Sequence, residues 1–207
     1  MLCLWILKLG PIAKGKERTK LFVSRAENKL AGATQAFSFD FKGKTVLDIG
    51  SSTGGFTEYA LSSGAKKVIA VEKGTNQMKA PLRFDPRVEL HEKTDIFECI
   101  SLDLIPDVIV ADVSFVSLKK VLAHAKKYLA TRDTDFLVML KPQFEAKPEQ
   151  LNKGVVKNEK MRREIMRGFE NWLKMNGFLI VKKHDNELSG KNGNIERFYW
   201  LKIGKIS

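Results

Sequence analysis

The residues best suited to binding chemistry lie in one turn, at positions 48–56. The apolar run 45–49 is typical of a buried strand, and a short stretch of small residues leads from it into a helical pattern. Glycines let the backbone approach a ligand closely, and ligands of open α/β sheets bind beyond the ends of such strands. We therefore expect a cofactor site to include Asp48, Gly50, Ser51, Ser52, Thr53, Gly54, Gly55 and Phe56.

Two further carboxylates extend this candidate site. Glu72 ends the next apolar run, 24 residues after Asp48, where a carboxylate can accept hydrogen bonds from both hydroxyls of an adenosine ribose. Asp95 follows the third predicted strand and is placed to hold the adenine amino group. An anionic pyrophosphate would be repelled by Asp48, whereas a cationic amine and a sulfonium would be attracted. The pattern predicts S-adenosylmethionine as the cofactor.

Two alternative interpretations of the same residues stay open. Asp48, Glu72 and Asp95 could simply cap helices at strand ends. An NAD-dependent oxidoreductase would carry the fingerprint Gly-x-Gly-x-x-Gly after its first strand. Here Asp48 stands in place of the first glycine, and three residues separate Gly50 from Gly54. This spacing argues against an NAD site. Binding calorimetry with NAD and with S-adenosylmethionine would distinguish an oxidoreductase from a methyltransferase.

The elements that must position these residues alternate along the chain. Apolar runs predict strands at 45–49, 68–71, 108–111, 136–140 and 178–181, and amphipathic patterns predict helices at 56–63, 118–129 and 160–175. Gly64 and Gly177 stand where helix C-terminal glycines belong. A capping box at Ser24 opens an earlier helix to about residue 36. We expect an α/β, doubly wound, mostly parallel sheet with helices on both faces, closed by an antiparallel strand at 195–203.

The charge distribution indicates a polyanionic partner. The chain carries a net charge of +12, yet residues 44–140 hold 13 basic and 13 acidic side chains, so the excess lies at the two ends. A basic field of this kind suits RNA, although a solvated surface is the alternative. Phe115, Phe144 and Phe198 are candidates for stacking on bases. The basic residues expected to contact RNA are Lys14, Lys16, Arg18, Lys20, Arg25, Lys153, Lys157, Arg162 and Arg163.

Other classes of protein are disfavoured by composition. Cys3 and Cys99 are too few and too distant for a disulfide framework or a zinc site, and His91, His124 and His184 show no metal-ligand spacing. The apolar opening, residues 1–9, is much shorter than the roughly 20 residues that a membrane span needs. It also lacks the features of a signal peptide. We expect a cytoplasmic protein that binds neither metal nor membrane.

Five segments resemble a known family. They are 23–30 (VSRAENKL), 48–57 (DIGSSTGGFT), 112–118 (DVSFVSL), 141–145 (KPQFE) and 193–196 (GNIE). In this order they are similar to the TlyA, or haemolysin A-like, branch of the FtsJ-type ribose methyltransferases. The resemblance runs from about residue 22 to residue 200. It implies a Rossmann-like methyltransferase fold that binds S-adenosylmethionine, with Asp112 also near the cofactor.

The resemblance also implies a reaction and the residues that perform it. Members of the branch methylate the ribose 2′-hydroxyl of cytidine in ribosomal RNA, so ribosomal RNA or a ribosomal subunit is the expected partner. The catalytic tetrad of the wider group corresponds here to Lys29, Asp112, Lys141 and Glu196. Lys141 follows the predicted strand 136–140, and our hypothesis is that it acts as the general base. Asp112 would orient its amine, and Lys29 and Glu196 would position the ribose.

Two departures from the family pattern affect these expectations. The branch usually carries an N-terminal S4-type RNA-binding domain, whereas we expect residues 1–21 to be a basic extension or a linker remnant and residues 22–207 to form the methyltransferase domain. Ala26-Glu27 replaces the usual pair of glycines before Lys29. The alternative function is a non-catalytic RNA-binding protein that retains the fold and binds the cofactor without methyl transfer. The presence of all four tetrad residues argues against it.

Overall fold

One seven-stranded sheet organises the chain. The computed structural model describes residues 25–186 and 193–204, and its main sheet has the strand order β3-β2-β1-β4-β5-β9-β8. The strands are β1 (Thr45–Ile49), β2 (Lys67–Glu72), β3 (Val88–Glu92), β4 (Val108–Ala111), β5 (Asp135–Leu140), β8 (Phe178–Asp185) and β9 (Arg197–Ile203). β1 to β5 are parallel, and β9 runs antiparallel to both of its neighbours. The expected sheet, with its antiparallel last strand, is confirmed.

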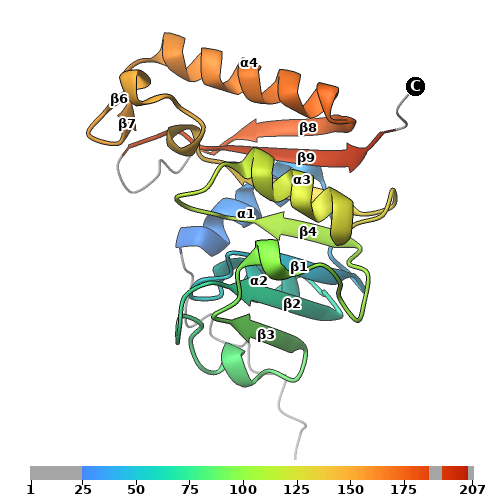
Figure 1. The fold of residues 1–207 in the computed structure, drawn as a ribbon. Coiled ribbons are helices and arrows are strands. Elements are labelled where there is room, and N and C mark those ends of the chain that lie inside the picture. The colour runs from blue at the N-terminus through green and yellow to red at the C-terminus, as the bar shows by residue number, and fades with distance from the viewer. Residues whose placement is uncertain (1–24, 187–192, 205–207) are drawn as a thin grey trace, which may run out of the picture.

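Helices cover both faces of this sheet (Figure 1). They are α1 (Arg25–Phe37), α2 (Gly55–Ser62), α3 (Leu118–Tyr128) and α4 (Glu159–Met175). Successive strand residues point to opposite faces, and β1 illustrates the result. Val46 packs in a cluster with Phe56 of α2, whereas Leu47 belongs to a second cluster with Phe169 of α4. Two apolar cores therefore hold a doubly wound fold.

The predicted element boundaries hold to within a few residues. β1 and β4 match their predicted ranges, and Gly64 and Gly177 adopt positive φ at helix ends as expected. β8 extends beyond 181 to Asp185, where exposed polar residues of an edge strand mask the apolar signal. The last strand starts at Arg197 instead of residue 195. The predicted capping residue Ser24 and the extension at 1–21 lie outside the described residues.

The sheet brings the ends of five parallel strands to one edge. The order reverses between β1 and β4, which is the point where open α/β sheets bind ligands. Short elements follow the strands at this edge: η2 (Ile96–Glu98) after β3, and η3 (Pro142–Phe144) after β5. A two-stranded hairpin, β6 (Leu151–Asn152) and β7 (Val155–Val156), stands beyond η3. None of the described helices is long and apolar enough to span a membrane.

Candidate active site

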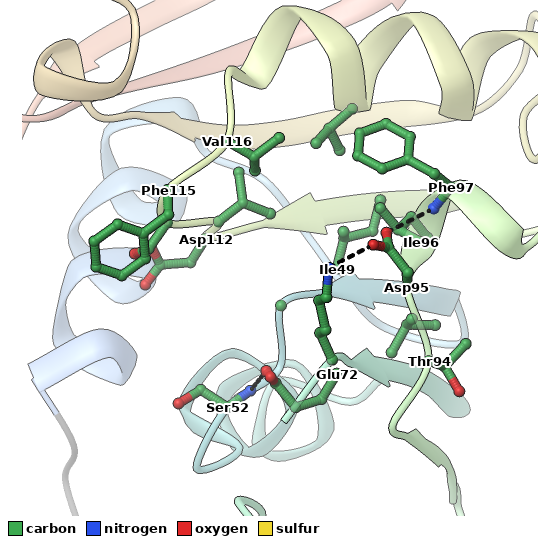
Figure 2. A pocket seen from close by; sticks show the side chains of 16 residues that line it. Ile49, Ser52, Glu72, Thr94, Asp95, Ile96, Phe97, Asp112, Phe115 and Val116 are labelled. Atoms are coloured by element: carbon green, nitrogen blue, oxygen red, sulfur yellow. Dashed lines mark hydrogen bonds and ion pairs between the residues drawn. The ribbon is translucent and has the colours of Figure 1, made fainter. Parts of the chain in front are cut away.

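A cavity of about 550 Å³ opens at the strand-order reversal (Figure 2). Residues at the ends of β1 and β2 and in the segments after β3 and β4 form its walls. Its size falls within the range of small-molecule sites. The expected cofactor residues that line it are Gly50, Ser52, Glu72, Asp95 and Asp112. The cavity therefore gathers one expected carboxylate from each of three different segments.

Glu72 joins the turn after β1 to the end of β2. Its Oε2 accepts a hydrogen bond from the backbone N–H of Ser52 at 2.8 Å, and its Oε1 accepts one from Gly74 at 2.6 Å. A carboxylate offers about four acceptor positions, so each oxygen keeps capacity for a ligand hydroxyl. Glu72 thus shapes the turn and still presents acceptors to the cavity (Figure 2).

Asp95 both caps a helix and lines the cavity. Its Oδ1 accepts from the backbone N–H of Phe97 at 3.1 Å, and its Oδ2 lies 2.8 Å from Nζ of Lys73. The hydrogen bond from Lys73 is the main reason that the pKa of Asp95 is lowered. The capping interpretation is correct for this residue, yet the same side chain faces the cavity (Figure 2).

Asp48 lies beneath the turn and not on the cavity wall. Its side chain is fully buried on the face that carries α2, where Oδ2 accepts from the hydroxyl of Thr57 at 2.6 Å. No described residue donates a hydrogen bond to its Oδ1. Burial raises the pKa of Asp48 to about 7. This corrects the expectation that an ionised Asp48 faces the ligand directly.

The glycine turn is shaped by close contact between two loops. Gly50 has a φ of +79°, and a Cβ there would lie 3.2 Å from the backbone oxygen of Asp112. Apart from Gly50 and Ser52, the expected turn residues do not line the main cavity. Thr53 and Gly55 line a second cavity on the α2 side, and Phe56 packs against Phe198. The last two expected turn residues, Ser51 and Gly54, line neither of these two cavities.

The four tetrad residues form two ion pairs. Nζ of Lys141 lies 2.7 Å from Oδ1 of Asp112 and donates to Oγ of Ser114 at 2.9 Å. Nζ of Lys29, on α1, donates to Oε2 of Glu196 at 2.5 Å. The Lys29 and Glu196 side chains are both buried, and the Lys141 side chain is only 13% exposed. Each lysine is thus held by one carboxylate from a distant part of the sequence.

Strand register places the two ion pairs side by side. Leu140 at the end of β5 pairs with Arg197 at the start of β9. Lys141 and Glu196 are the next residues on these two strands, at the same edge of the sheet. Asp112 belongs to the cavity wall as well as to the pair with Lys141. The four residues of the candidate tetrad therefore lie at one edge of the sheet, and Asp112 connects them to the cavity.

The basic residues expected to contact RNA do not share one environment. Lys153, at the turn of the β6–β7 hairpin, and Lys157, just after it, are exposed, as is Arg163 on α4. The expectation for Arg162 is wrong: its side chain is buried, with its Nη2 2.8 Å from Asp185 and its Nε donating to the backbone oxygen of Ile195. Arg25 is the first residue of α1. The residues outside the described part of the chain are Lys14, Lys16, Arg18 and Lys20.

The three candidate stacking aromatics also differ from one another. Phe115 is 92% exposed and contacts the ring of Phe144, with 5.2 Å between the ring centroids. Phe198 is completely buried in the core under α2, so the expectation that it stacks on RNA bases is wrong. The inward direction of alternate residues on β9 explains this, because Phe198 points to the face that α1 and α2 cover. Of the three aromatics, only Phe115 presents a largely exposed ring.

Some site residues were not singled out from the sequence. Ser114 contacts Lys141, and Lys73 pairs with Asp95 on the cavity wall. Ser114 stands two residues after Asp112 within a segment that carries the family resemblance, so a signal for it was present. Lys73 follows Glu72 directly and gave no such signal. Within residues 25–186 and 193–204, no group of three or more His, Cys, Asp and Glu side chains could hold a metal ion.

Comparison with known proteins agrees with this geometry. Residues 22–203 match the family model described as FtsJ-like methyltransferase. The chain is 38% identical, over 88% of its length and 69% of the relative's, to the 16S/23S rRNA (cytidine-2′-O)-methyltransferase TlyA of Mycobacterium tuberculosis. It is 35% identical, over 88% and 71%, to the 23S rRNA (cytidine-2′-O)-methyltransferase TlyA of Campylobacter jejuni. A solved haemolysin-type structure from Streptococcus thermophilus superposes with a TM-score of 0.85 at 32% identity, covering 92% of this chain and 70% of that one.

Proposed function

Because the chain belongs to the FtsJ-like methyltransferase family, we propose that it methylates the 2′-hydroxyl of a cytidine ribose in ribosomal RNA, with S-adenosylmethionine as methyl donor. One observation carries the proposal from the structure. The Lys141–Asp112 ion pair stands at the rim of the cavity, and Glu196, which pairs with Lys29 of α1, directly precedes the adjoining strand β9. This arrangement offers a proton acceptor and a place for a ribose next to the expected methyl donor.

The cavity residues suit S-adenosylmethionine. Glu72 has acceptor capacity for the two ribose hydroxyls, and Asp95 stands beside Ile96 and Phe97, which supply apolar surface for an adenine ring. Gly50 leaves room for the close approach of two loops at the inner end of the cavity. When bound, the cofactor supplies an electrophilic methyl group on a sulfonium. The remaining task falls to residues of this chain, which must align the hydroxyl and remove its proton.

Lys141 is placed to take that proton. A ribose hydroxyl is a weak nucleophile, and general-base assistance typically contributes about 10²–10⁴-fold in rate. Lys141 would first have to release the proton of its ion pair to solvent, and its neutral Nζ would then accept the 2′-hydroxyl proton. Asp112 and Ser114 hold Nζ from the β4 side, which fixes its direction. The alignment of reacting atoms adds to the rate in the same way that other well-oriented intramolecular reactions are accelerated.

The RNA would approach over the same edge of the sheet. The buried Lys29–Glu196 pair would position the target ribose, and the exposed Phe115 offers a stacking surface for a base released from its helix. Lys153, Lys157 and Arg163 are exposed and would contact phosphates. These contacts would be weakened by salt, as expected for phosphate binding.

Mapping of methylated nucleosides tests the proposal. Purified protein is incubated with S-adenosylmethionine and with either free ribosomal RNA or assembled subunits from cells that lack the gene. Mass spectrometry then locates any 2′-O-methylcytidine. We expect at least one cytidine to gain the modification with wild-type protein, and far less modification in the same time with Lys141→Ala. Cofactor binding without methylation of either substrate would support the non-catalytic alternative and contradict the proposal.

A further inference from the structure

Glu145 caps a helix that is not its own. It follows Lys141 by four residues, yet its Oε1 accepts a hydrogen bond from the backbone N–H of Leu118 at 2.6 Å. Its Oε2 accepts from Oγ of Ser117 at 2.8 Å. Ser117 is the N-cap residue of α3 and makes no capping hydrogen bond with its own side chain. A carboxylate from the segment after β5 thus replaces the usual local cap of α3.

A short rigid path joins Glu145 to Lys141. Residues 142–144 form the single 3-10 turn η3, and Pro142 is its first residue. The backbone N–H of Phe144 donates to the oxygen of Lys141 at 3.0 Å, and that of Glu145 donates to the oxygen of Pro142 at 3.1 Å. With these two hydrogen bonds, a displacement of Glu145 is transmitted to Lys141.

Glu145 completes a set of three contacts between two segments. The segment after β4, residues 112–118, contacts the segment after β5, residues 141–145, at three places that lie at increasing distance from the sheet. Lys141 contacts Asp112 and Ser114 nearest the sheet, and the rings of Phe144 and Phe115 meet farther out. Glu145 fixes the far end by binding the start of α3. Lys141, the proposed general base, and the exposed ring of Phe115 therefore belong to two segments that are held together near the sheet by Lys141 and Asp112 and at the far end by Glu145.

The conformation of this segment needs such an anchor. Phe115 has a φ of 63°, which places a bulky non-glycine residue in the left-handed region. Residues in sparsely populated backbone regions persist only where the surroundings hold them. The Glu145 side chain is only 3% exposed, and burial raises its pKa. A buried carboxylate with good donors is costly to leave unpaired, so its contacts favour one position of the segment.

We propose that Glu145 is a positioning residue that sets the place of residues 112–118, and through them the direction of the Lys141 amine. It does not itself touch substrate or cofactor. The inference rests on the proposed methyltransferase function, because it assigns Glu145 a role in that same site. Its structural part, the anchoring of residues 112–118, is measurable without any reaction.

The test compares Glu145→Ala and Glu145→Gln with Glu149→Ala, which removes an exposed carboxylate from the same stretch of chain. We measure the single-turnover rate of RNA methylation, the affinity for S-adenosylmethionine by calorimetry, and amide hydrogen exchange across the protein. Glu145→Ala should slow methyl transfer by about 10- to 100-fold, as misplacement of a catalytic group by about 1 Å does. Cofactor affinity should fall by less than the rate does, because Glu145 itself does not line the cavity and acts there only through residues 112–116.

Exchange should accelerate by about tenfold or more at residues 112–119 and stay unchanged in the core strands. Glu145→Gln keeps an acceptor for Leu118 and should recover the rate to within about fivefold of wild type. Ser117→Ala removes the hydrogen bond from Ser117 to Glu145 while keeping the one from Leu118. If Glu145→Ala does not fold, Ser117→Ala tests the same role, and we expect a smaller loss of rate. Glu149→Ala should match wild type in every measurement.

Three outcomes would overturn the inference. One is a Glu145→Ala rate within about threefold of wild type, which is below the effect of a misplaced base. Another is faster exchange spread over the whole sheet, which would mean a general loss of stability. The third is no change of exchange at residues 112–119. Failure of the wild-type protein to methylate any RNA would instead contradict the proposed function. Hydrogen exchange in Glu145→Ala would still show whether Glu145 anchors residues 112–118.

Discussion

Nζ of Lys29 lies 2.5 Å from Oε2 of Glu196, although 167 sequence positions separate the two residues. Lys29 belongs to α1, and Glu196 directly precedes β9. Both side chains are buried, so each charge depends on the other for its stabilisation. The first described helix and the last strand are therefore joined at the edge of the sheet that carries the cavity. Lys29 and Glu196 are therefore candidate site residues that also stabilise the fold.

The first prediction concerns the stability of this pair. Lys29→Met leaves the Glu196 carboxylate buried without its cation, and we expect a loss of about 3 kcal/mol in the free energy of unfolding. The double variant Lys29→Met, Glu196→Gln should be more stable than the single variant, because no unpaired charge remains. Urea denaturation measures both. Lys73→Met, at a lysine that is 80% exposed, is the matched control and should leave the free energy of unfolding nearly unchanged. Equal losses in the single and double variants would contradict the explanation.

The second prediction concerns Glu72 and the cofactor. Glu72→Ala removes the proposed acceptor for the ribose hydroxyls and also the acceptor for the Ser52 N–H. We expect S-adenosylmethionine affinity to fall by about 10- to 100-fold, since a hydrogen bond to a charged group is worth about 1.5–3 kcal/mol. Isothermal titration calorimetry gives the dissociation constant. Glu98→Ala makes the same charge change at an exposed residue near the cavity and should leave affinity within about twofold. An unchanged affinity in Glu72→Ala would exclude its proposed role.

The third prediction concerns Phe115 and the RNA. Its ring is 92% exposed, so Phe115→Ala should leave thermal stability unchanged. We expect kcat/KM for RNA to fall by about tenfold or more, because stacking on a base contributes about 1–3 kcal/mol. Phe84→Ala, at a phenylalanine that is 77% exposed on the loop after β2, serves as control and should keep wild-type kinetics. If both variants methylate RNA equally well, Phe115 is not a stacking surface.

The fourth prediction uses the raised pKa of Asp48. Its value of about 7 in the folded protein exceeds the ordinary 3.8, because burial disfavours the charged form. The folded state therefore binds more protons than the unfolded state between about pH 4 and 7. Its contribution to stability is fully present below pH 3.8 and is lost as pH rises through about 7, with an upper limit of roughly 4 kcal/mol.

Asp48→Asn tests this by removing the titration while keeping an acceptor for Thr57. Urea denaturation at several pH values gives the stability of each protein, and the difference between them cancels other titrating groups. We expect wild type to lose stability relative to Asp48→Asn as pH rises from 4 to 8. A constant difference over this range would show that Asp48 does not titrate there.

The pattern of elements could be predicted because it leaves local signals: apolar runs of four or five residues predict the central strands. The candidate tetrad of Lys29, Asp112, Lys141 and Glu196 was assigned from motifs in the segments that carry these residues. The structure adds how these residues pair, which depends on the register of β5 with β9. Sequence spacing does not specify that register, because the two strands are far apart along the chain.

The wrong expectations share one physical cause. Arg162 and Phe198 were assigned to RNA by residue type, but burial depends on which face of an element each side chain occupies. Arg162 lies on the inner side of α4 and pairs with Asp185, and Phe198 faces the core under α2. Likewise, the side chain of Asp48 points to the same face of β1 as Val46, which is the face covered by α2 and not the cavity. Residue type predicted the chemistry of these side chains, and only the packing shows where that chemistry is directed.

The measurement that tests the central claim most directly is single-turnover methyl transfer by Lys141→Ala with S-adenosylmethionine bound. Lys147→Ala, at an exposed lysine six residues later, is the control. We predict that Lys141→Ala binds the cofactor normally and transfers the methyl group about 10²–10⁴-fold more slowly, whereas Lys147→Ala matches wild type. A Lys141→Ala rate close to that of wild type, with cofactor bound and RNA saturating, would contradict the account.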